Sequence, residues 1–459
     1  MKNKKMFDAI TDIDDELIEE AKEIKKSKLG RKRILGLVAS VVLIIGISLF
    51  VKTMQGNSNI APLAQVIYPK AYAFDDYDSM GRVRDENPVT SNTIKAINNF
   101  AYKTGSLILK EGEGNKNYSP LSLYYALAMA TTGAQGQTEK ELLDLLGMYN
   151  SKTLSTESGN LYKQLYKDNK IGKLKIANSI WLGNEINGEP AAFKDNFIDN
   201  AAKNFYASSY NVNFADIETG KAMGKWISEN TNGTLSPEIK TNPEQILSII
   251  NTVYFYDQWI NRFDKEKTLE DTFYLSDGKE VKVDFMNQTL GSAGFARGKN
   301  FTRSSLALKN GGEMIFILPD QGVSPYDLLS SPEEIERSFE EGEDAYGEVV
   351  WKIPKFSFDS EFKLKDHLKE LGVREAFNPD ADFTGITDNM AYINDIHQET
   401  YISIDEEGVE ASAFTQIYYD GSGQPEGRAE MVLDRPFIYG ITAPNGNLLF
   451  IGICSNPAD

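Results

Sequence analysis

Near its C-terminus the chain carries a stretch that alternates like a β-strand but lacks the side chains that usually fill one. Residues 409–419 read Val-Glu-Ala-Ser-Ala-Phe-Thr-Gln-Ile-Tyr-Tyr, so alternate side chains would face the same way in an extended backbone. No Gly, Pro or charge interrupts residues 411–419, so every peptide group there could join a sheet ladder. Alanine and serine are poor filling for a fixed strand. They suit a segment that must enter between existing strands, and Gly408 before it offers a pivot.

This stretch resembles the hinge of the serpins, whose pattern is Glu-x-Gly-Thr-Glu-Ala-Ala-Ala-Ala-Thr ahead of an exposed reactive loop. Val409 takes the place of the usual Thr or Ser, and Phe414 takes the place of an Ala. Val is close to Thr in shape, and Phe414 would face away from the core after insertion. The alternative interpretation is an edge strand with a hairpin loop. The residues that match the hinge are Glu406, Glu407, Gly408, Val409, Glu410, Ala411, Ser412, Ala413, Phe414 and Thr415.

Further blocks resemble serpin signatures and follow one another in the family's order. Together they cover nearly all of the chain after residue 91, which makes the resemblance specific although no single tetrapeptide would be. The blocks are Asn117-Tyr118-Ser119-Pro120, Asn178-Ser179-Ile180-Trp181, Asn251-Thr252-Val253-Tyr254, Ile353-Pro354-Lys355-Phe356, Ala381-Asp382-Phe383-Thr384, Arg435-Pro436-Phe437 and Leu449-Phe450-Ile451-Gly452.

The resemblance implies the α+β serpin fold, with a large central mixed β-sheet A, sheets B and C, about eight or nine helices and an exposed reactive loop. The apolar pattern itself predicts an α+β domain. We expect Thr138 to cap a helix and Asn445-Gly446 to form a tight hairpin turn. The predicted helices are residues 93–110, 119–129, 138–146, 191–205 and 364–371, and the predicted strands are 174–182, 246–256, 313–318, 349–358 and those within 428–453.

An apolar, uncharged run over residues 34–51 lies at the short end of the roughly 17–25 residues that span a bilayer. Six Lys and Arg residues between Lys25 and Arg33 precede it, and only Lys52 follows closely. This asymmetry predicts a single-pass membrane protein with a cytoplasmic N-terminus and an extracellular domain. No small-x-small cleavage site follows Phe50, which favours an uncleaved anchor over a signal peptide. The predicted parts are a charged cytoplasmic segment 1–33, a transmembrane helix 34–51, an extracytoplasmic linker 52–91 and a serpin domain 92–459.

Composition excludes some partners. The net charge of −19 argues against nucleic acid, which requires a basic face. Cys454 is the single cysteine, so no disulfide forms within the domain, which suits a bacterial surface of the Gram-positive kind. No group of residues has the spacing of zinc ligands. We therefore expect a monomer without metal or cofactor.

The chain is not expected to be an enzyme. It has two histidines, His367 and His397, and no pattern marks either as the base of a Ser-His or Cys-His pair. His367 falls on the polar side of a predicted helix, and Cys454 lies in a buried strand. A histidine within an apolar strand, as His397 is, is more often a hydrogen-bonded core residue.

The resemblance implies two structural sites around the central sheet. The first is the shutter, a polar cluster of Ser119, Ser122, Asn251 and His397 beneath the strands that part to admit the loop. Short hydroxyls, an amide and an imidazole can satisfy one another when they are buried. The second is the breach, where insertion begins and where Trp259 would pack.

The mechanism that the resemblance implies is suicide inhibition of a serine or, as a second class, a cysteine endopeptidase. The protease cleaves the loop, and the hinge inserts as a strand and drags the acyl-enzyme with it. The family's spacing puts the bait bond near Ser422. Its small neighbours favour a subtilisin- or elastase-like target. The bait-bond window is Asp420, Gly421, Ser422, Gly423 and Gln424.

Two alternatives remain open at this point. One is a serpin fold without inhibitory activity that acts as a binding module. The other is a protease sensor that signals through the cytoplasmic residues 1–33.

Overall fold

Two large sheets organise the part of the chain that the computed structural model describes, which is residues 60–110, 112–409 and 427–459. In the first, a seven-stranded sheet, two pairs of strands are parallel and the others antiparallel. This confirms the large mixed sheet that the resemblance implied. Its strands in order are β13 (Phe356–Lys363), β14 (Ile393–Ile404), β15 (Gly408–Val409), β7 (Leu247–Gln258), β3 (Lys173–Gly183) and β2 (Lys167–Asp168), with β6 (Ala207–Val212) also on β3.

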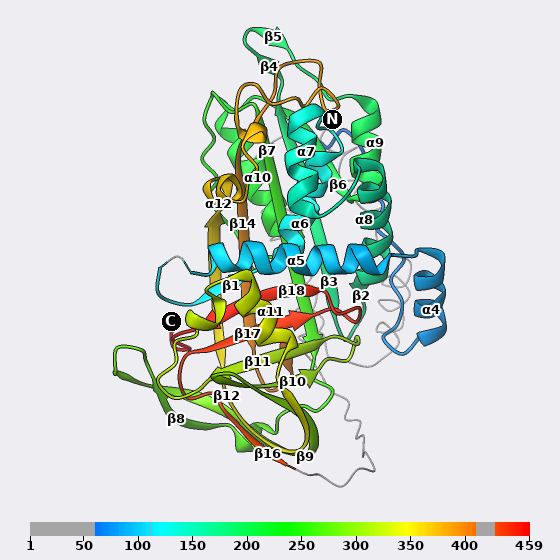
Figure 1. Ribbon diagram of the computed structural model, residues 1–459. Helices are drawn as coiled ribbons and strands as arrows, with labels where there is room; N and C mark the ends of the chain where they lie inside the picture. The colour runs from blue at the N-terminus through cyan, green and yellow to red at the C-terminus, as the bar shows by residue number, and fades with distance from the viewer. Residues whose placement is uncertain (1–59, 111, 410–426) are drawn as a thin grey trace, which may run out of the picture. The chain divides into compact units, whose positions relative to one another are not determined.

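The second sheet has nine strands and contains the strands expected for sheets B and C as one hydrogen-bonded path. In Figure 1, β17 and β18 run across the view, whereas β14 and β7 of the first sheet run upright. A two-stranded ribbon, β4 (Glu185–Ile186) and β5 (Glu189–Pro190), is separate. The nine strands in order are β1 (Lys116–Tyr118), β18 (Leu448–Cys454), β17 (Phe437–Thr442), β11 (Glu313–Pro319), β10 (Phe301–Ala307), β9 (Glu280–Gly298), β12 (Glu343–Pro354) and β16 (Arg428–Val432), with β8 (Leu269–Tyr274) on β9.

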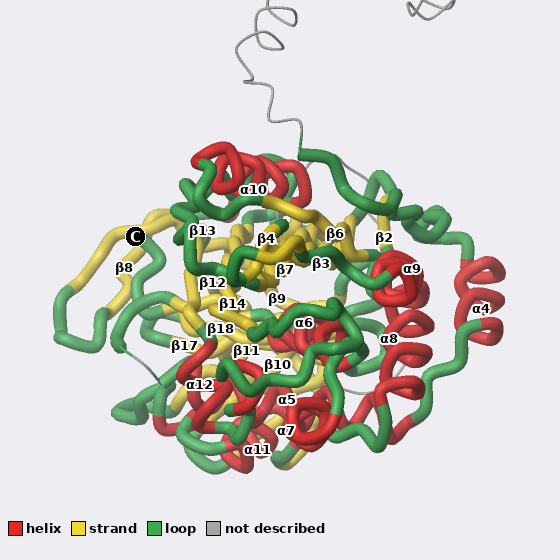
Figure 2. The backbone as a smooth tube through the Cα atoms, turned by 90° about the horizontal axis from the view of Figure 1, so that it is seen from above, coloured by secondary structure: helices red, strands yellow, loops and turns green. Residues whose placement is uncertain are grey.

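Nine α-helices occur within the described residues. Every residue of one of them, α6, is buried. The Oγ atom of Ser119 caps α6 by accepting a hydrogen bond from the backbone N–H of Ser122, and Pro120 occupies the first helical position. Figure 2 shows α10 on one face of the seven-stranded sheet and α6 on the other. The helices are α4 (Tyr77–Glu86), α5 (Ser91–Ile108), α6 (Pro120–Thr131), α7 (Gly136–Leu146), α8 (Ser151–Leu165), α9 (Asp195–Asn204), α10 (Ile217–Asn230), α11 (Pro332–Glu340) and α12 (Lys365–Glu370).

The seven-stranded sheet is buried on both faces. On β7, Ile249 and Val253 belong to the main core, which includes α6, whereas Ile250 belongs to a smaller core with Trp226 and Ile227 of α10. Because successive side chains of a strand point to opposite faces, a strand between two apolar layers has apolar residues at both parities. This explains why β7 appears in the sequence as a continuous apolar run.

Each predicted helix and strand has a counterpart in the structure, with three differences in detail. Thr138 does not cap α7, because the helix begins two residues earlier, at Gly136. Its hydroxyl oxygen accepts a hydrogen bond from Asp382 N (3.0 Å). The helix predicted over 191–205 begins at Asp195. The strand predicted over 349–358 is two strands in different sheets, because the chain leaves β12 after Pro354, which has no N–H to donate to a ladder.

Residues 60–91, the described part of the predicted linker, contact the sheet edge and carry a helix, α4. The backbone N–H of Leu63 donates to Ser209 O of β6 (2.8 Å). The ring of Tyr68 stacks on those of Tyr166 and Tyr206, with centroids 5.8 and 6.0 Å away. These contacts place this part of the segment against the edge of the seven-stranded sheet.

The cytoplasmic segment and the transmembrane helix predicted over residues 1–51 lie outside the described residues. Within the ranges that the structure covers, no helix combines the length and the apolar character needed to cross a membrane.

Replacing Tyr68 by Ala should lower the free energy of unfolding by about 1–3 kcal/mol, because two ring stacks are lost. Urea denaturation followed by circular dichroism measures this difference. Tyr77→Ala is the matched control, since Tyr77 is 70% exposed. Equal effects of the two substitutions would contradict a stabilising role for the Tyr68 stack.

Candidate functional site

The boundary between the neighbouring strands β14 and β7, here called the seam, is hydrogen-bonded along only part of its length. The two parallel strands pair from Ile393 and Leu247 as far as Glu399 and Thr252. Beyond that point, toward their carboxyl ends, the described residues show no further pairs between them. There Val409 of β15 lies between the strands and pairs with Ile404 on one side and Asp257 on the other.

A narrow cavity of about 10 Å³ lies along the unpaired part of the seam, next to Val409. This is about the space that one water molecule needs. A longer inserted strand therefore requires β14 and β7 to move apart. The residues that line the cavity are Asn117, Phe255, Tyr401, Ile402, Ser403, Val409, Ile441 and Phe450.

A tight turn brings Val409 back against the end of β14. The side chain of Asp405 accepts hydrogen bonds from the N–H groups of Glu407 (2.8 Å) and Gly408 (3.3 Å). The backbone N–H of Asp405 donates to Gly408 O (3.0 Å). A Cβ atom on Gly408 would lie 2.2 Å from Asp257 O, so only glycine allows this close approach of the hinge to β7.

Trp259, the residue predicted for the breach, contacts this turn. Its side chain is 0% exposed. The indole Nε1–H donates to Asp405 O (2.9 Å), and the backbone N–H of Trp259 donates to Glu407 O (3.1 Å). A tryptophan at this position therefore does more than fill the core, because it fixes the start of the hinge.

Glu406 anchors the hinge through a charge that is almost completely buried, at 6% side-chain exposure. Its carboxylate accepts hydrogen bonds from Thr268 Oγ1 (2.8 Å) and from Lys355 Nζ (3.1 Å). Burial alone would raise the pKa of Glu406, but hydrogen bonds from its own backbone, Thr268 and Lys355 outweigh burial and lower that pKa. Lys355 lies in one of the sequence blocks, and only the structure identifies its partner.

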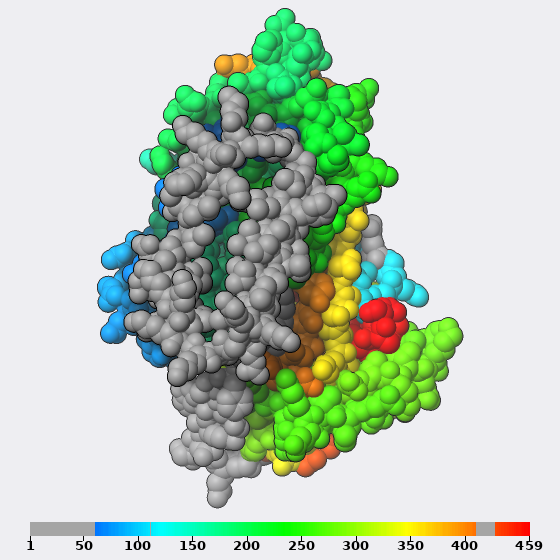
Figure 3. All heavy atoms as spheres, turned by 180° about the vertical axis from the view of Figure 1, so that it is seen from behind, coloured from blue at the N-terminus to red at the C-terminus, as the bar shows by residue number. Residues whose placement is uncertain are grey.

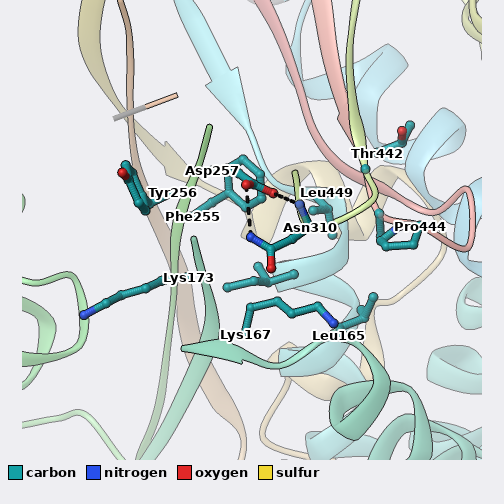
Figure 4. Close-up of a pocket in the computed structure, with 13 residues that line it drawn as sticks. Leu165, Lys167, Lys173, Phe255, Tyr256, Asp257, Asn310, Thr442, Pro444 and Leu449 are labelled. Carbon is teal, nitrogen blue, oxygen red and sulfur yellow. Dashed lines mark hydrogen bonds between the residues drawn. The ribbon is translucent and has the colours of Figure 1, made fainter. Parts of the chain in front are cut away.

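Asp257, the partner of Val409 on β7, is a buried carboxyl group at the same end of the seam. Asn310 donates to it from its backbone N–H (3.2 Å) and from its side-chain amide (3.0 Å), as Figure 4 shows. Burial raises the pKa of Asp257 to about 6, although these bonds and the backbone N–H of Gln258 favour the charged form. The oxygen of the Asn310 amide accepts a hydrogen bond from Asn169 (2.9 Å), which in turn donates to Tyr72 O (3.2 Å).

The polar cluster beneath the sheet contains three of the four residues assigned to the shutter. Ser119, Ser122 and Asn251 are all buried. The hydroxyl of Ser119 donates to Leu449 O (2.7 Å), and the amide of Asn251 donates to Asn178 Oδ1 (2.6 Å). Asn178, from one of the sequence blocks, thus belongs to the cluster as well.

The structure does not bring His397 into this cluster, which corrects the assignment made from the sequence. Gln398 takes the expected place, because it accepts from Ser119 N (2.9 Å) and its side-chain N–H donates to Ser119 O (2.8 Å). Successive residues of β14 point to opposite faces, so an assignment that is off by one residue selects the wrong face. His397 lies 40% exposed on the face of α10, with Nε2 3.1 Å from Asp395 Oδ2.

The remaining candidate residues are Cys454, His367 and those that the structure does not describe. Cys454 is buried, and burial raises the pKa of its thiol well above the usual value, which disfavours the thiolate that a nucleophile needs. His367 lies on α12. The hinge residues Glu410 to Thr415 and the bait-bond window Asp420 to Gln424 lie outside the described residues.

The raised pKa of Asp257 predicts a pH-dependent contribution to stability. The folded state binds this proton more tightly than the unfolded chain, whose aspartate pKa is about 4. The contribution is therefore complete below pH 4 and is lost as the pH rises through about 6. The side chain of the Asp257→Asn variant cannot ionise. As the pH rises from 4 to 7.5, the free energy of unfolding of the native protein should therefore fall by roughly 2 kcal/mol relative to that of the variant.

Urea denaturation of both proteins at the two pH values measures the difference. The same substitution at the exposed Asp344 is the control for general pH effects. A difference between native protein and Asp257→Asn that does not change with pH would contradict the assignment.

Comparison with known proteins agrees with this arrangement. The family model described as Serpin (serine protease inhibitor) matches residues 95–457. Serpin A3-6 of Bos taurus is 29% identical over 381 residues, which cover 81% of this chain and 88% of the relative. A serpin-like protein of Methanosarcina acetivorans is 30% identical over 380 residues, which cover 79% of this chain and 85% of the relative.

A solved structure shows the same fold. The crystal structure of the thermophilic serpin tengpin in its native state aligns with a TM-score of 0.73 at 25% identity. The alignment covers 86% of this chain and 99% of the tengpin chain. Since the family model spans well over half of the sequence, the chain belongs to the serpin family.

Proposed function

We propose that this protein is a suicide inhibitor of a serine endopeptidase that traps its target by cleavage of the reactive loop and insertion of the hinge. Serpins are in general inhibitors of proteases and not enzymes, which supports this activity. The observation that carries the proposal is β15, because Gly408 and Val409 already pair between β14 and β7. The hinge thus occupies the first position of an additional strand.

The catalytic groups belong to the protease, and the inhibitor supplies the peptide bond that is cleaved. The serine hydroxyl of the protease attacks a carbonyl within residues 420–424, an ester forms, and the peptide on the far side leaves as an amine. The hinge is then free of its second attachment and can extend β15 along the seam. The attached protease moves with it, and its active site is distorted before water can hydrolyse the ester.

The fold with the hinge inserted has a lower free energy than the native fold, so insertion is favourable once the loop is cut. Each residue that joins the seam can form ladder hydrogen bonds with both neighbouring strands, at a net gain of about 1 kcal/mol each. Side chains that follow Val409 at alternate positions become buried, at about 0.8 kcal/mol per methylene group. The cost is the widening of the seam, which the clamp of Trp259, Glu406 and Lys355 and the shutter cluster oppose.

The target that the loop favours is a protease with a small specificity pocket. The residues of the bait-bond window have small or short polar side chains, which supports a subtilisin- or elastase-like serine protease. A cysteine protease is the second class of target.

The location that we propose is the outer face of a bacterial cell membrane. The apolar run 34–51 is long enough to anchor the chain, and the basic residues before it favour a cytoplasmic N-terminus. Residues 52–91 would then connect the anchor to the inhibitory domain outside the cell.

Val409→Arg should abolish trapping but leave loop cleavage intact. Val409 is 2% exposed between β14 and β7, and a buried unpaired guanidinium at the first inserted position would stop the strand from forming. We expect at least a tenfold fall in the fraction of subtilisin or elastase that runs as a covalent complex on denaturing gels. Mass spectrometry of the released peptide locates the bait bond.

Leu269→Arg is the matched control, because Leu269 is 63% exposed on β8. This variant should trap protease as the native protein does. A Val409→Arg variant that still forms the complex would contradict insertion through this seam. Cleavage of the native loop without any complex would contradict inhibition and favour the binding or sensing module.

Deletion of residues 34–51 should move the protein from the membrane fraction to the soluble fraction of the expressing cells. The reason is that hydrocarbon burial of this run is the proposed source of membrane attachment. Ultracentrifugation after a high-salt wash measures the distribution. Full-length protein that is released by salt alone would contradict an anchor and indicate electrostatic attachment.

A further inference from the structure

A second and larger cavity crosses the same seam on the face that α10 covers. Its volume is about 420 Å³, within the range of small-molecule sites. Figure 3 shows this side of the molecule, where yellow β13 borders orange β14 next to the green chain around α10. The cavity is separate from the narrow one next to Val409, because the two share no lining residue.

The walls of the larger cavity come from both strands of the closed part of the seam. Ser248, Ile250 and Thr252 line it from β7, and His397 and Glu399 line it from β14. Thr252 and Glu399 are register partners, at the last pair before the strands separate. A molecule bound here would therefore contact both strands that have to move apart during insertion.

One side of the cavity is apolar. Met223 and Ile227 of α10 and Ile239 of the following loop line it together with Ile250. These side chains can bury a hydrocarbon or aromatic group, at about 25 cal/mol for each square ångström removed from water.

The opposite side of the cavity carries two polar side chains, Glu399 and Thr252, that can accept hydrogen bonds from a ligand. Glu399 is partly buried, and no lysine or arginine forms an ion pair with it in the part of the chain that the structure describes. Burial and the nearby charges of Glu361 and Asp359 raise its pKa and outweigh the charge of His397, which lowers it, as expected for a carboxylate without a full counter-charge. Thr252 is 1% exposed, and its hydroxyl finds no hydrogen-bond partner among the described residues.

The other charged groups at the cavity leave this acceptor available. His397 is engaged by Asp395, with Nε2 3.1 Å from Oδ2. Glu361 and Lys363 are exposed residues at the mouth, on β13, as are Glu238 and Lys240 on the loop after α10. Glu399 is thus the innermost acidic group, and the ligand that fits it carries a positive charge.

We propose that this cavity binds a small organic ammonium ion with an apolar body, the ammonium group on Glu399 and Thr252 and the body against Met223, Ile227 and Ile239. An alkylamine or an arylalkylamine has this chemistry. Inorganic cations do not fit as well, because they leave the apolar wall without a partner. A carboxylate ligand would meet Glu399 and Glu361 with the same charge.

A consequence follows if the proposed inhibitory function holds. The bound amine would contact β7 and β14 together, and it would have to leave or shift before the seam could open along its full length. Its presence should slow insertion and lower the fraction of protease that is trapped.

Isothermal titration calorimetry of the full-length protein with tryptamine tests the site, and indoleacetate is the control with the same ring and the opposite charge. We expect tryptamine to bind and indoleacetate to bind at least tenfold more weakly. Glu399→Gln should weaken tryptamine binding at least tenfold, whereas Glu270→Gln, an exposed glutamate on β8, should leave it unchanged.

Ile239→Arg provides a second variant at a partly exposed loop position, where the guanidinium can reach the cavity and compete with the amine. It should abolish tryptamine binding, and circular dichroism checks its fold. Equal binding of the two indoles, or tryptamine binding that both Glu399→Gln and Ile239→Arg leave intact, would overturn the site.

Complex formation with subtilisin at saturating tryptamine tests the consequence. A lower yield with the native protein, and no change with Glu399→Gln, is the expected result. An unchanged yield with the native protein would overturn the effect on insertion. A failure of the native protein to trap any protease would contradict the inhibitory function, and calorimetry would still decide whether the site exists.

Discussion

The unfinished pairing between β14 and β7 is the constraint on which the rest of the structure depends. The strands are hydrogen-bonded from Ile393 and Leu247 to Glu399 and Thr252, and among the described residues only Val409 pairs with both of them at their carboxyl ends. Within the described residues the facing edges of the two strands are not paired along their full length, so ladder hydrogen bonds remain to be gained there. The surrounding residues hold this arrangement, and β14 and β7 have to move apart before a longer strand can lie between them.

Two groups of contacts hold the seam. At the open end, Trp259 binds the hinge turn, and the buried ion pair of Glu406 and Lys355 anchors it. Beneath the closed part, Ser119 and Gln398 exchange two hydrogen bonds across α6 and β14. Such buried polar contacts have a defined geometry, and breaking them is costly because the groups left behind lose their partners. They are therefore suited to holding the two strands in one fixed arrangement.

The helices and strands followed from patterns that are local in the sequence. Period and length were enough for α5, β7 and β3, whose boundaries lie within a few residues of those expected. The hinge stays a prediction beyond Val409, because the small residues that follow Gly408 lie outside the described residues. The shutter was predicted in part: Ser119 and Asn251 are in the cluster, whereas Gln398 replaces His397. The error is one residue, and in a strand one residue is the difference between two faces.

By itself the sequence determined the family and the α+β architecture, because these depend on residue types in a fixed order. Tertiary structure decided what no local pattern encodes, since the partners are far apart along the chain. Examples are the contact of Lys355 with Glu406, the contact of Asn310 with Asp257, and the cavity where Thr252 meets Glu399. Pairing across a sheet is set by register and by packing on both faces, so it becomes defined only when the whole sheet has formed.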